Sequence, residues 1–147
     1  MLQLIQSEEA KWKLFSTRRG GGLPFFVQAV VSTELMATTA AAAPVAADTS
    51  DSGGGEGRRQ SSLATCMRTL LSLAEAVHAD DADNFSKVLA MYILSALFKD
   101  TRLGEDVLQY AETALLCAIG GFDSAYWNVR NASTLLFSSL MNRIFGV

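Results

Sequence analysis

Charged residues are scarce in this chain of 147 residues: Asp, Glu, Lys and Arg make up 18% of it, against roughly 25% in an average soluble protein. The formal net charge of −3 supplies no overall attraction to nucleic acid or to an anionic membrane. Half of the residues are hydrophobic. Low charge and high apolar content together predict helices whose faces need partners, as in one section of a helical solenoid.

Side chains that commonly carry catalysis are also scarce. The one histidine, His78, follows an apolar segment, and the two cysteines, Cys66 and Cys117, stand far apart among apolar residues. We interpret the cysteines as buried, reduced thiols and His78 as a surface or helix-capping residue. An enzyme using either thiol with His78 is therefore the least favoured hypothesis. The expectation is a non-enzymatic protein.

Known ligand-binding patterns are missing as well. The glycines at residues 20–22 lack the Lys-Ser/Thr of a phosphate-binding loop, and the acidic run at residues 80–83 lacks the Gly and Glu of a calcium loop. We therefore expect no metal and no small-molecule cofactor. No apolar run approaches the roughly 18 residues of a membrane span. The N terminus lacks the order of a secretory signal, so a cytoplasmic location is expected by default.

No segment shows the alternation of a strand, and apolar residues recur at helical spacing, which predicts an all-α fold. Residues 1–37 predict a helix, a Gly-rich turn and a second helix from Phe25 to about Leu35. Residues 38–62, rich in Ala, Gly and Ser, predict a disordered linker. Residues 63–147 predict four helices, the third ending at Gly120-Gly121. In the helix after the turn, the positions expected to be apolar are Phe25, Phe26, Val30 and Val31.

Antiparallel helix pairs of this length match an armadillo/HEAT-type α-solenoid better than a closed four-helix bundle. The last helical pattern, residues 125–147, is amphipathic and stops at the end of the chain. We therefore expect a fragment of a larger solenoid.

Two basic features are candidates for binding. Arg18 and Arg19 precede the glycine turn, where arginine forks and bare backbone N–H groups could meet a phosphate or an acidic partner. Arg130 opens the last helix beside Trp127 and Asn131. The structural interpretation of Arg130 is an arginine that bridges helices or caps carbonyls, and the functional one is a partner contact.

Three blocks resemble the THADA (thyroid adenoma-associated) family. Residues 17–29 carry Arg-Arg-Gly-Gly-Gly-Leu-Pro, similar to the family signature Arg-Arg-Ser-Ala-Gly-Leu-Pro. Residues 96–104 read Ala-Leu-Phe-Lys-Asp-Thr-Arg-Leu-Gly, and residues 127–147 begin Trp-Asn-Val-Arg-Asn-Ala-Ser. All three occur in the family's order.

The resemblance implies a large armadillo/HEAT-type solenoid and a non-catalytic accessory subunit for tRNA 2′-O-ribose methylation at position 32 of the anticodon loop. Its implied partners are a tRNA 2′-O-methyltransferase and tRNA, which it would position for that enzyme. The resemblance implies that the family turn contacts tRNA or a partner. In this chain the turn comprises Arg18, Arg19, Gly22, Leu23 and Pro24.

The chain departs from the family at several positions. Gly20 and Gly21 replace Ser and Ala of the signature, which raises the entropic cost of ordering the turn. Where relatives read His-Ala-Leu-Asn-Ile-Leu-Arg, this chain has Leu89, Tyr92 and Ser95 at the three polar positions. Two alternatives therefore stay open. One is a protein-interaction scaffold without a tRNA role, with a membrane calcium transporter as one partner proposed for animal relatives, and the other is a divergent, non-functional fragment.

Overall fold

The computed structural model describes residues 22–41, 55–76 and 81–146. These residues form helices and no strand, so the all-α prediction is confirmed for this part of the chain. The helices are α3 (Leu23–Ala41), α4 (Gly55–Glu75), α5 (Asp81–Lys99), the 3-10 helix η2 (Thr101–Tyr110), α6 (Ala111–Phe122) and α7 (Trp127–Phe145).

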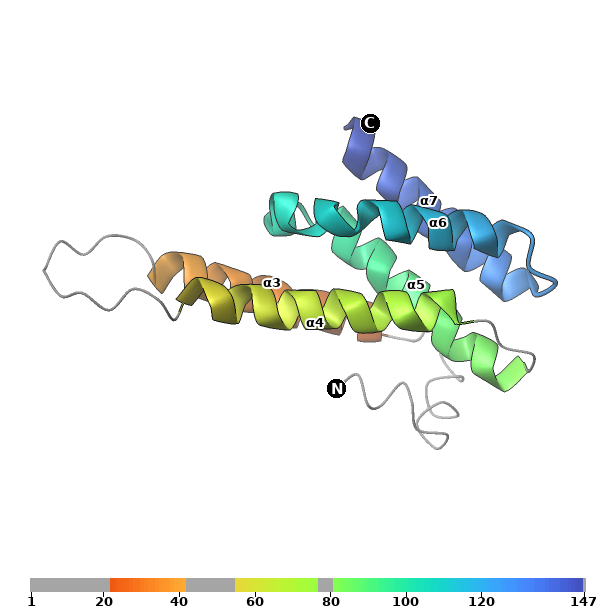
Figure 1. Cartoon of the computed structure of the whole chain (residues 1–147), viewed down its shortest axis with the longest axis horizontal. Helices are drawn as coiled ribbons and strands as arrows, with labels where there is room; N and C mark the ends of the chain where they lie inside the picture. Colours follow the sequence, from red (N-terminus) through yellow and green to blue (C-terminus); the bar gives the residue numbers. More distant parts are fainter. Residues whose placement is uncertain (1–21, 42–54, 77–80, 147) are drawn as a thin grey trace, which may run out of the picture.

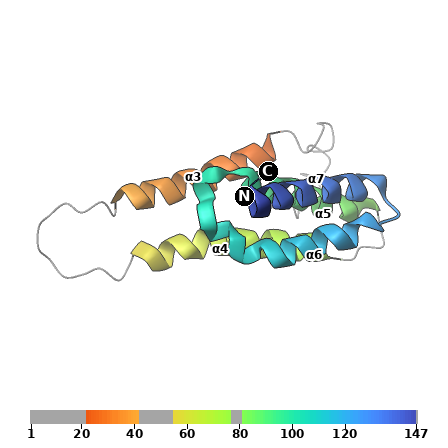
Figure 2. The ribbon, with the colours of Figure 1, turned by 90° about the horizontal axis from the view of Figure 1, so that it is seen from above.

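Helices α3 and α4 run antiparallel, side by side, and α6 and α7 form a second pair (Figures 1 and 2). Helix α5 lies between the two pairs and contacts α3, α4 and α7. On the first pair, Ser62 Oγ donates a hydrogen bond of 2.9 Å to Glu34 Oε2. The arrangement places α5 at the centre of the molecule.

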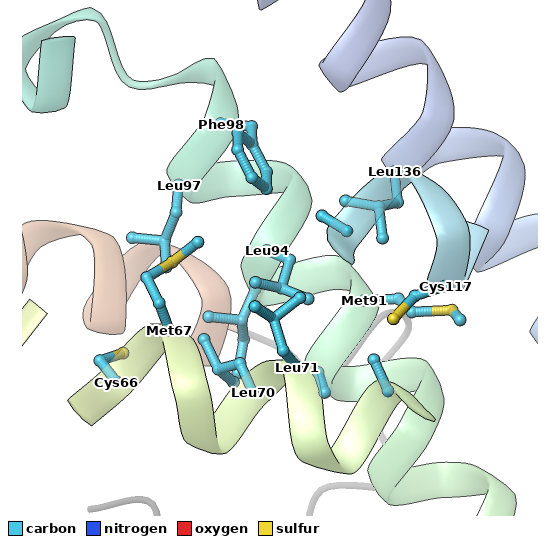
Figure 3. Close-up of a cluster of buried hydrophobic side chains, with 14 of the residues drawn as sticks. Cys66, Met67, Leu70, Leu71, Met91, Leu94, Leu97, Phe98, Cys117 and Leu136 are labelled. Carbon is cyan, nitrogen blue, oxygen red and sulfur yellow. The ribbon is translucent and has the colours of Figure 1, made fainter. Parts of the chain in front are cut away.

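The core is built around this central helix. From Val88 to Phe98 only Tyr92 and Ala96 are not buried, and all of these residues except Tyr92 and Ser95 are apolar, as expected of a helix that its neighbours enclose. Figure 3 shows the cluster where α4, α5, α6 and α7 meet. Its labelled members are Cys66, Met67, Leu70, Leu71, Met91, Leu94, Leu97, Phe98, Cys117 and Leu136.

Helices reach further into the predicted linker than the sequence indicates. Helix α3 continues to Ala41 and α4 begins at Gly55, so both ends of residues 38–62 are helical. Residues 42–54 lie outside the described residues. The helix predicted before the Gly-rich turn also lies outside them, as does His78.

The buried face of α3 differs from the prediction. Of the four residues expected to be its apolar positions, only Val31 is buried, whereas Phe25 is 70% exposed and Phe26 and Val30 are also exposed. The face that meets the core carries Val27 and Val31, one helical turn apart. Two exposed phenylalanines therefore lie at the start of this helix.

The third helix predicted within residues 63–147 consists of two elements, because the residues up to Tyr110 belong to the 3-10 helix η2 and α6 begins at Ala111. Gly104, with φ 50° and ψ −130°, forms a kink near the start of η2. Helix α6 ends at Phe122, one residue after the predicted stop at Gly120-Gly121. Phe122 then packs edge-on against Phe137 of α7, with ring centroids 5.6 Å apart. None of the helices in the described ranges is long and apolar enough to cross a membrane.

Candidate functional site

The glycine turn leads directly into α3. Arg18 and Arg19 lie outside the described residues. Gly22 is exposed, and its carbonyl accepts the Phe26 N–H at 2.8 Å, which closes the first helical turn. Pro24 is buried and Leu23 is half-buried against the core. Of the five residues expected to contact tRNA or a partner, the described three therefore anchor the start of α3, and Gly22 alone is exposed.

A buried carboxylate, Asp100, joins α3 to the segment that follows α5. It stands between Lys99, the last residue of α5, and η2, and it is 5% exposed. Gln28 Nε2 donates to Asp100 Oδ2 at 3.1 Å, and Ser32 Oγ donates to the same oxygen. These bonds link positions 72 and 68 residues apart in sequence. The first half of α3 is thereby fixed to the end of α5.

Arg102 donates further hydrogen bonds to the same carboxylate. Its backbone N–H and its Nε donate to Asp100 Oδ1 at 3.0 and 2.9 Å, and its Nη2 donates to Oδ2 at 2.7 Å. The Arg102 guanidinium, then Ser32, the Arg102 amide and Gln28, hold the pKa of Asp100 well below its ordinary value, although burial alone would raise it. Asp100 is therefore a permanent anion at neutral pH and caps η2.

The third sequence block, residues 127–147, contacts the segment after Asp100 through Arg143. Arg143, in the last turn of α7, donates from Nη2 to the carbonyl of Gly104. Gly104 is exposed and has a backbone conformation that residues with a side chain rarely adopt. Gln28, Asp100 to Gly104, and Arg143 come from the three sequence blocks in turn. We call this set the Asp100 junction.

The start of α7 is fastened differently. Arg130 Nη1 donates to the carbonyls of Ser124 and Ala125 at 2.6 and 3.0 Å, which matches the carbonyl-capping interpretation of this arginine. Trp127, by contrast, is 71% exposed. Asn131 Nδ2 donates to the Tyr92 hydroxyl at 3.1 Å. Arg130 and Asn131 thus hold parts of this chain together, and Trp127 points to solvent.

Two of the three substituted positions of α5 lie at its contact with α7. Leu89 is buried in the core, Tyr92 accepts the bond from Asn131, and Ser95 Oγ lies 2.6 Å from Ser139 Oγ. Two of the three replacements therefore take part in a polar link between α5 and α7.

The thiols have the environment of structural residues. Cys66 and Cys117 are both free and buried, as predicted. Burial raises the pKa of Cys66 to about 11, and it is also the main cause that raises the pKa of Cys117. A raised pKa opposes formation of the nucleophilic thiolate. Within residues 22–41, 55–76 and 81–146, no three His, Cys, Asp or Glu side chains gather as metal ligands would.

Sequence reasoning singled out neither Asp100 nor its partners Gln28, Ser32 and Arg102. The available signal was Lys-Asp-Thr-Arg at residues 99–102, where an aspartate follows an apolar helix and precedes an arginine by two positions. That pattern predicts an N-cap. The pattern does not predict Gln28 or Ser32 as partners of Asp100, because these contacts arise from the tertiary fold.

Comparison with known proteins identifies close sequence relatives. The family described as THADA/TRM732, DUF2428 matches residues 1–128. The tRNA (32-2′-O)-methyltransferase regulator THADA of Mus musculus is 40% identical over 148 residues, which is 100% of this chain and 6% of the mouse protein. Its Homo sapiens counterpart is 38% identical over 147 residues, again 100% of this chain and 6% of the relative.

A more distant relative has the same assignment. The tRNA (32-2′-O)-methyltransferase regulator trm732 of Schizosaccharomyces pombe is 28% identical over 149 residues, or 99% of this chain and 8% of its own length. The chain therefore spans only 6–8% of the length of these relatives. No solved structure matches it. With most of its length matched by one family and relatives aligned along the whole of it, the chain belongs to the THADA/TRM732 (DUF2428) family.

Proposed function

We propose that this chain is part of a non-catalytic accessory protein for 2′-O-ribose methylation of tRNA at position 32 of the anticodon loop. The observation that carries the proposal is the alignment of the whole chain, at 40% identity, with a relative named as a regulator of a tRNA (32-2′-O)-methyltransferase. In this proposal the chain helps to position tRNA for a separate methyltransferase, and the accessory protein acts in the cytoplasm.

The helix pairs are proposed to be one section of an armadillo/HEAT-type solenoid. Exposed apolar side chains on the outer helices support this arrangement, since Phe25 on α3, Leu116 on α6 and Phe145 on α7 are each more than 60% exposed. In a solenoid such faces are covered by the neighbouring repeats. The central helix α5, by contrast, already has its neighbours.

Arg18 and Arg19 are the proposed contacts to tRNA or to the methyltransferase. Support comes from their place in the sequence, immediately before the turn that starts α3, whose Gln28 and Ser32 are bonded to Asp100. Arginine side chains close in sequence to a helix that is fixed in this way can bind a phosphate or carboxylate through their guanidinium groups.

The test is complementation with a chimera. In cells that lack the mouse THADA protein, its segment aligned with this chain is replaced by these residues, and methylation at tRNA position 32 is measured. We expect methylation to be restored, as it is by intact mouse THADA. A chimera that is expressed normally and yet restores no methylation would refute the proposal.

Variants of the chimera then assign a role to the turn. Arg18→Ala/Arg19→Ala should lose methylation, whereas Arg58→Ala/Arg59→Ala, at the other Arg-Arg pair of the sequence, should keep it. Lost methylation with the methyltransferase still co-purifying would assign Arg18 and Arg19 to tRNA. Lost co-purification would assign them to the enzyme interface.

A protein-interaction scaffold is the second candidate function, and the same exposed apolar faces favour it. A scaffold that binds through such faces should hold its partner at high salt, because apolar burial is not screened. Binding of tRNA should weaken steeply with salt. If the chimera restores no methylation but still binds a protein partner in high salt, the scaffold function is favoured.

A further inference from the structure

The Arg102 guanidinium is held along one edge and open along the other. Nε and Nη2 are bonded to Asp100, whereas Nη1 has no partner among the described residues, and 43% of the side chain is exposed. Guanidinium is a rigid, planar fork of five N–H donors. An arginine already fixed on one edge therefore offers the other edge to a ligand with little further loss of side-chain entropy.

A second guanidinium is fixed to the same turn. Arg143 binds the Gly104 carbonyl through Nη2, and its Nε and Nη1 have no partner in the part of the chain that the structure describes. Because Arg102 and Gly104 are two residues apart, their Cα atoms lie within about 7 Å. The turn that follows α5 thus carries one anchored arginine, Arg102, and its Gly104 carbonyl holds a second, Arg143, from the end of α7.

We propose that Arg102 and Arg143 form a phosphate-binding pair that contacts the RNA backbone at the Gly104 turn. This inference rests on the proposed function, and it gives that function a contact separate from Arg18 and Arg19. Phosphate oxygens accept paired bonds from arginine forks, and two forks held by different elements can bind two oxygens or two successive phosphates. The pair then fixes the register of the RNA.

The surrounding charge determines what kind of contact this is. Glu105 and Asp106 follow the turn and are exposed, and neither forms an ion pair with Arg102 or Arg143 among the described residues. Their negative charge, together with that of Asp100, which is paired with Arg102, offsets the long-range attraction of the arginines for RNA. The pair therefore acts at short range, through hydrogen-bond geometry, and not by drawing RNA in from a distance.

The test measures binding of a fluorescent, unmodified tRNA transcript to the complete chain between 50 and 200 mM salt. We expect Arg102→Gln and Arg143→Gln each to weaken binding about tenfold at low salt. Each should also make the dependence of log affinity on log salt shallower by about one. Arg68→Gln is the matched control, because Arg68 is an exposed arginine on α4 and belongs to neither η2 nor α7. It should change neither quantity.

A second variant addresses folding. Arg102→Gln leaves the Asp100 charge with fewer donors, so Asp100→Asn/Arg102→Gln removes both charges and keeps groups that can hydrogen-bond. This double variant should fold, as judged by its helical circular dichroism, and should bind RNA as weakly as Arg102→Gln.

Three results would overturn the inference. The first is an Arg102→Gln/Arg143→Gln chain that binds tRNA like Arg68→Gln, and the second is a wild-type chain that binds no tRNA at 50 mM salt. The third is displacement of tRNA from the arginine pair by polyglutamate more readily than by polyphosphate, which would assign the site to an acidic protein. Failure of the proposed function is seen separately, in the wild-type chimera that restores no methylation.

Discussion

A Cβ atom added to Gly121 on α6 would lie 1.9 Å from Oγ and 3.0 Å from Cβ of Ser133 on α7. The Ser133 hydroxyl donates to the Val129 carbonyl at 2.8 Å and lies 3.5 Å from Met91 Sδ. It therefore occupies the space that an alanine methyl would need. The close approach of α6 and α7 depends on the absence of a side chain at residue 121.

Gly121→Ala should destabilise the fold by about 1–3 kcal/mol, because the methyl forces Ser133 from its position or the helices apart. Gly120→Ala is the matched control, since nothing lies within 4 Å of its added Cβ. It should stabilise the helix by up to about 1 kcal/mol. Urea unfolding of the three chains measures both effects. Equal stability of the two variants would show that residue 121 is not a close contact.

Asp100 predicts a specific dependence of stability on pH. The folded-state pKa is depressed below the unfolded value of about 3.9, so this carboxylate stabilises the fold above that pH and its contribution is lost as pH falls through the folded pKa. At pH 7, Asp100→Asn should cost about 2 kcal/mol, since it loses charge-assisted hydrogen bonds. The difference from wild type should shrink below about pH 4.

Urea unfolding at several pH values between 7 and 3 checks this expectation. Asp106→Asn serves as its control, because the Asp106 side chain is exposed and makes no hydrogen bond among the described residues. Its difference from wild type should be small throughout the range. A cost of Asp100→Asn that does not change with pH would show that the charge of Asp100 is not what stabilises the junction.

Periodicity was sufficient to predict helices, but not which residues of a helix are buried. Helix α3 begins with Leu, Pro, Phe, Phe and Val, so apolar residues occur on all of its sides. The sequence predicted Phe25, Phe26, Val30 and Val31 as the apolar positions. The helix buries Val27 and Val31, and it packs against α5 and α4. The choice of face is made by neighbouring helices, which local sequence does not specify.

Local rules came close at the glycine pair but were not sufficient at Asp100. Gly120-Gly121 predicts a helix end, and α6 ends at Phe122, one residue later. The capping role of Asp100 could be predicted from its neighbours. Its bonds to Gln28 and Ser32 could not, because they join residues about 70 positions apart.

The corrected face of α3 gives a direct prediction. Val31→Ala should destabilise the fold by about 1–2 kcal/mol, because Val31 is 8% exposed and its methyl groups lie in the core. Phe26→Ala, which removes a much larger side chain that is 55% exposed, should change stability by less than about 0.5 kcal/mol. Thermal or urea unfolding compares the two. A larger loss for Phe26→Ala would restore the interpretation made from the sequence.

Gly104 and Gly146 allow backbone strain to be separated from side-chain crowding. Both have positive φ, and neither has an atom within 4 Å of an added Cβ. Gly146, with φ 68° and ψ 28°, is in the left-handed helical region that asparagine tolerates. Gly104, with φ 50° and ψ −130°, is in a region open almost only to glycine.

Gly104→Asn should therefore lose about 1–3 kcal/mol of stability, whereas Gly146→Asn should lose less than about 1 kcal/mol. The same side chain is added in open space in both variants, so any difference in urea unfolding reports the backbone alone. Because the Gly104 carbonyl accepts the bond from Arg143, Gly104→Asn should also weaken tRNA binding, and Gly146→Asn should leave it unchanged. Equal losses of stability in the two variants would mean that η2 can relax its kink, and that the turn does not hold Arg143 in a fixed place.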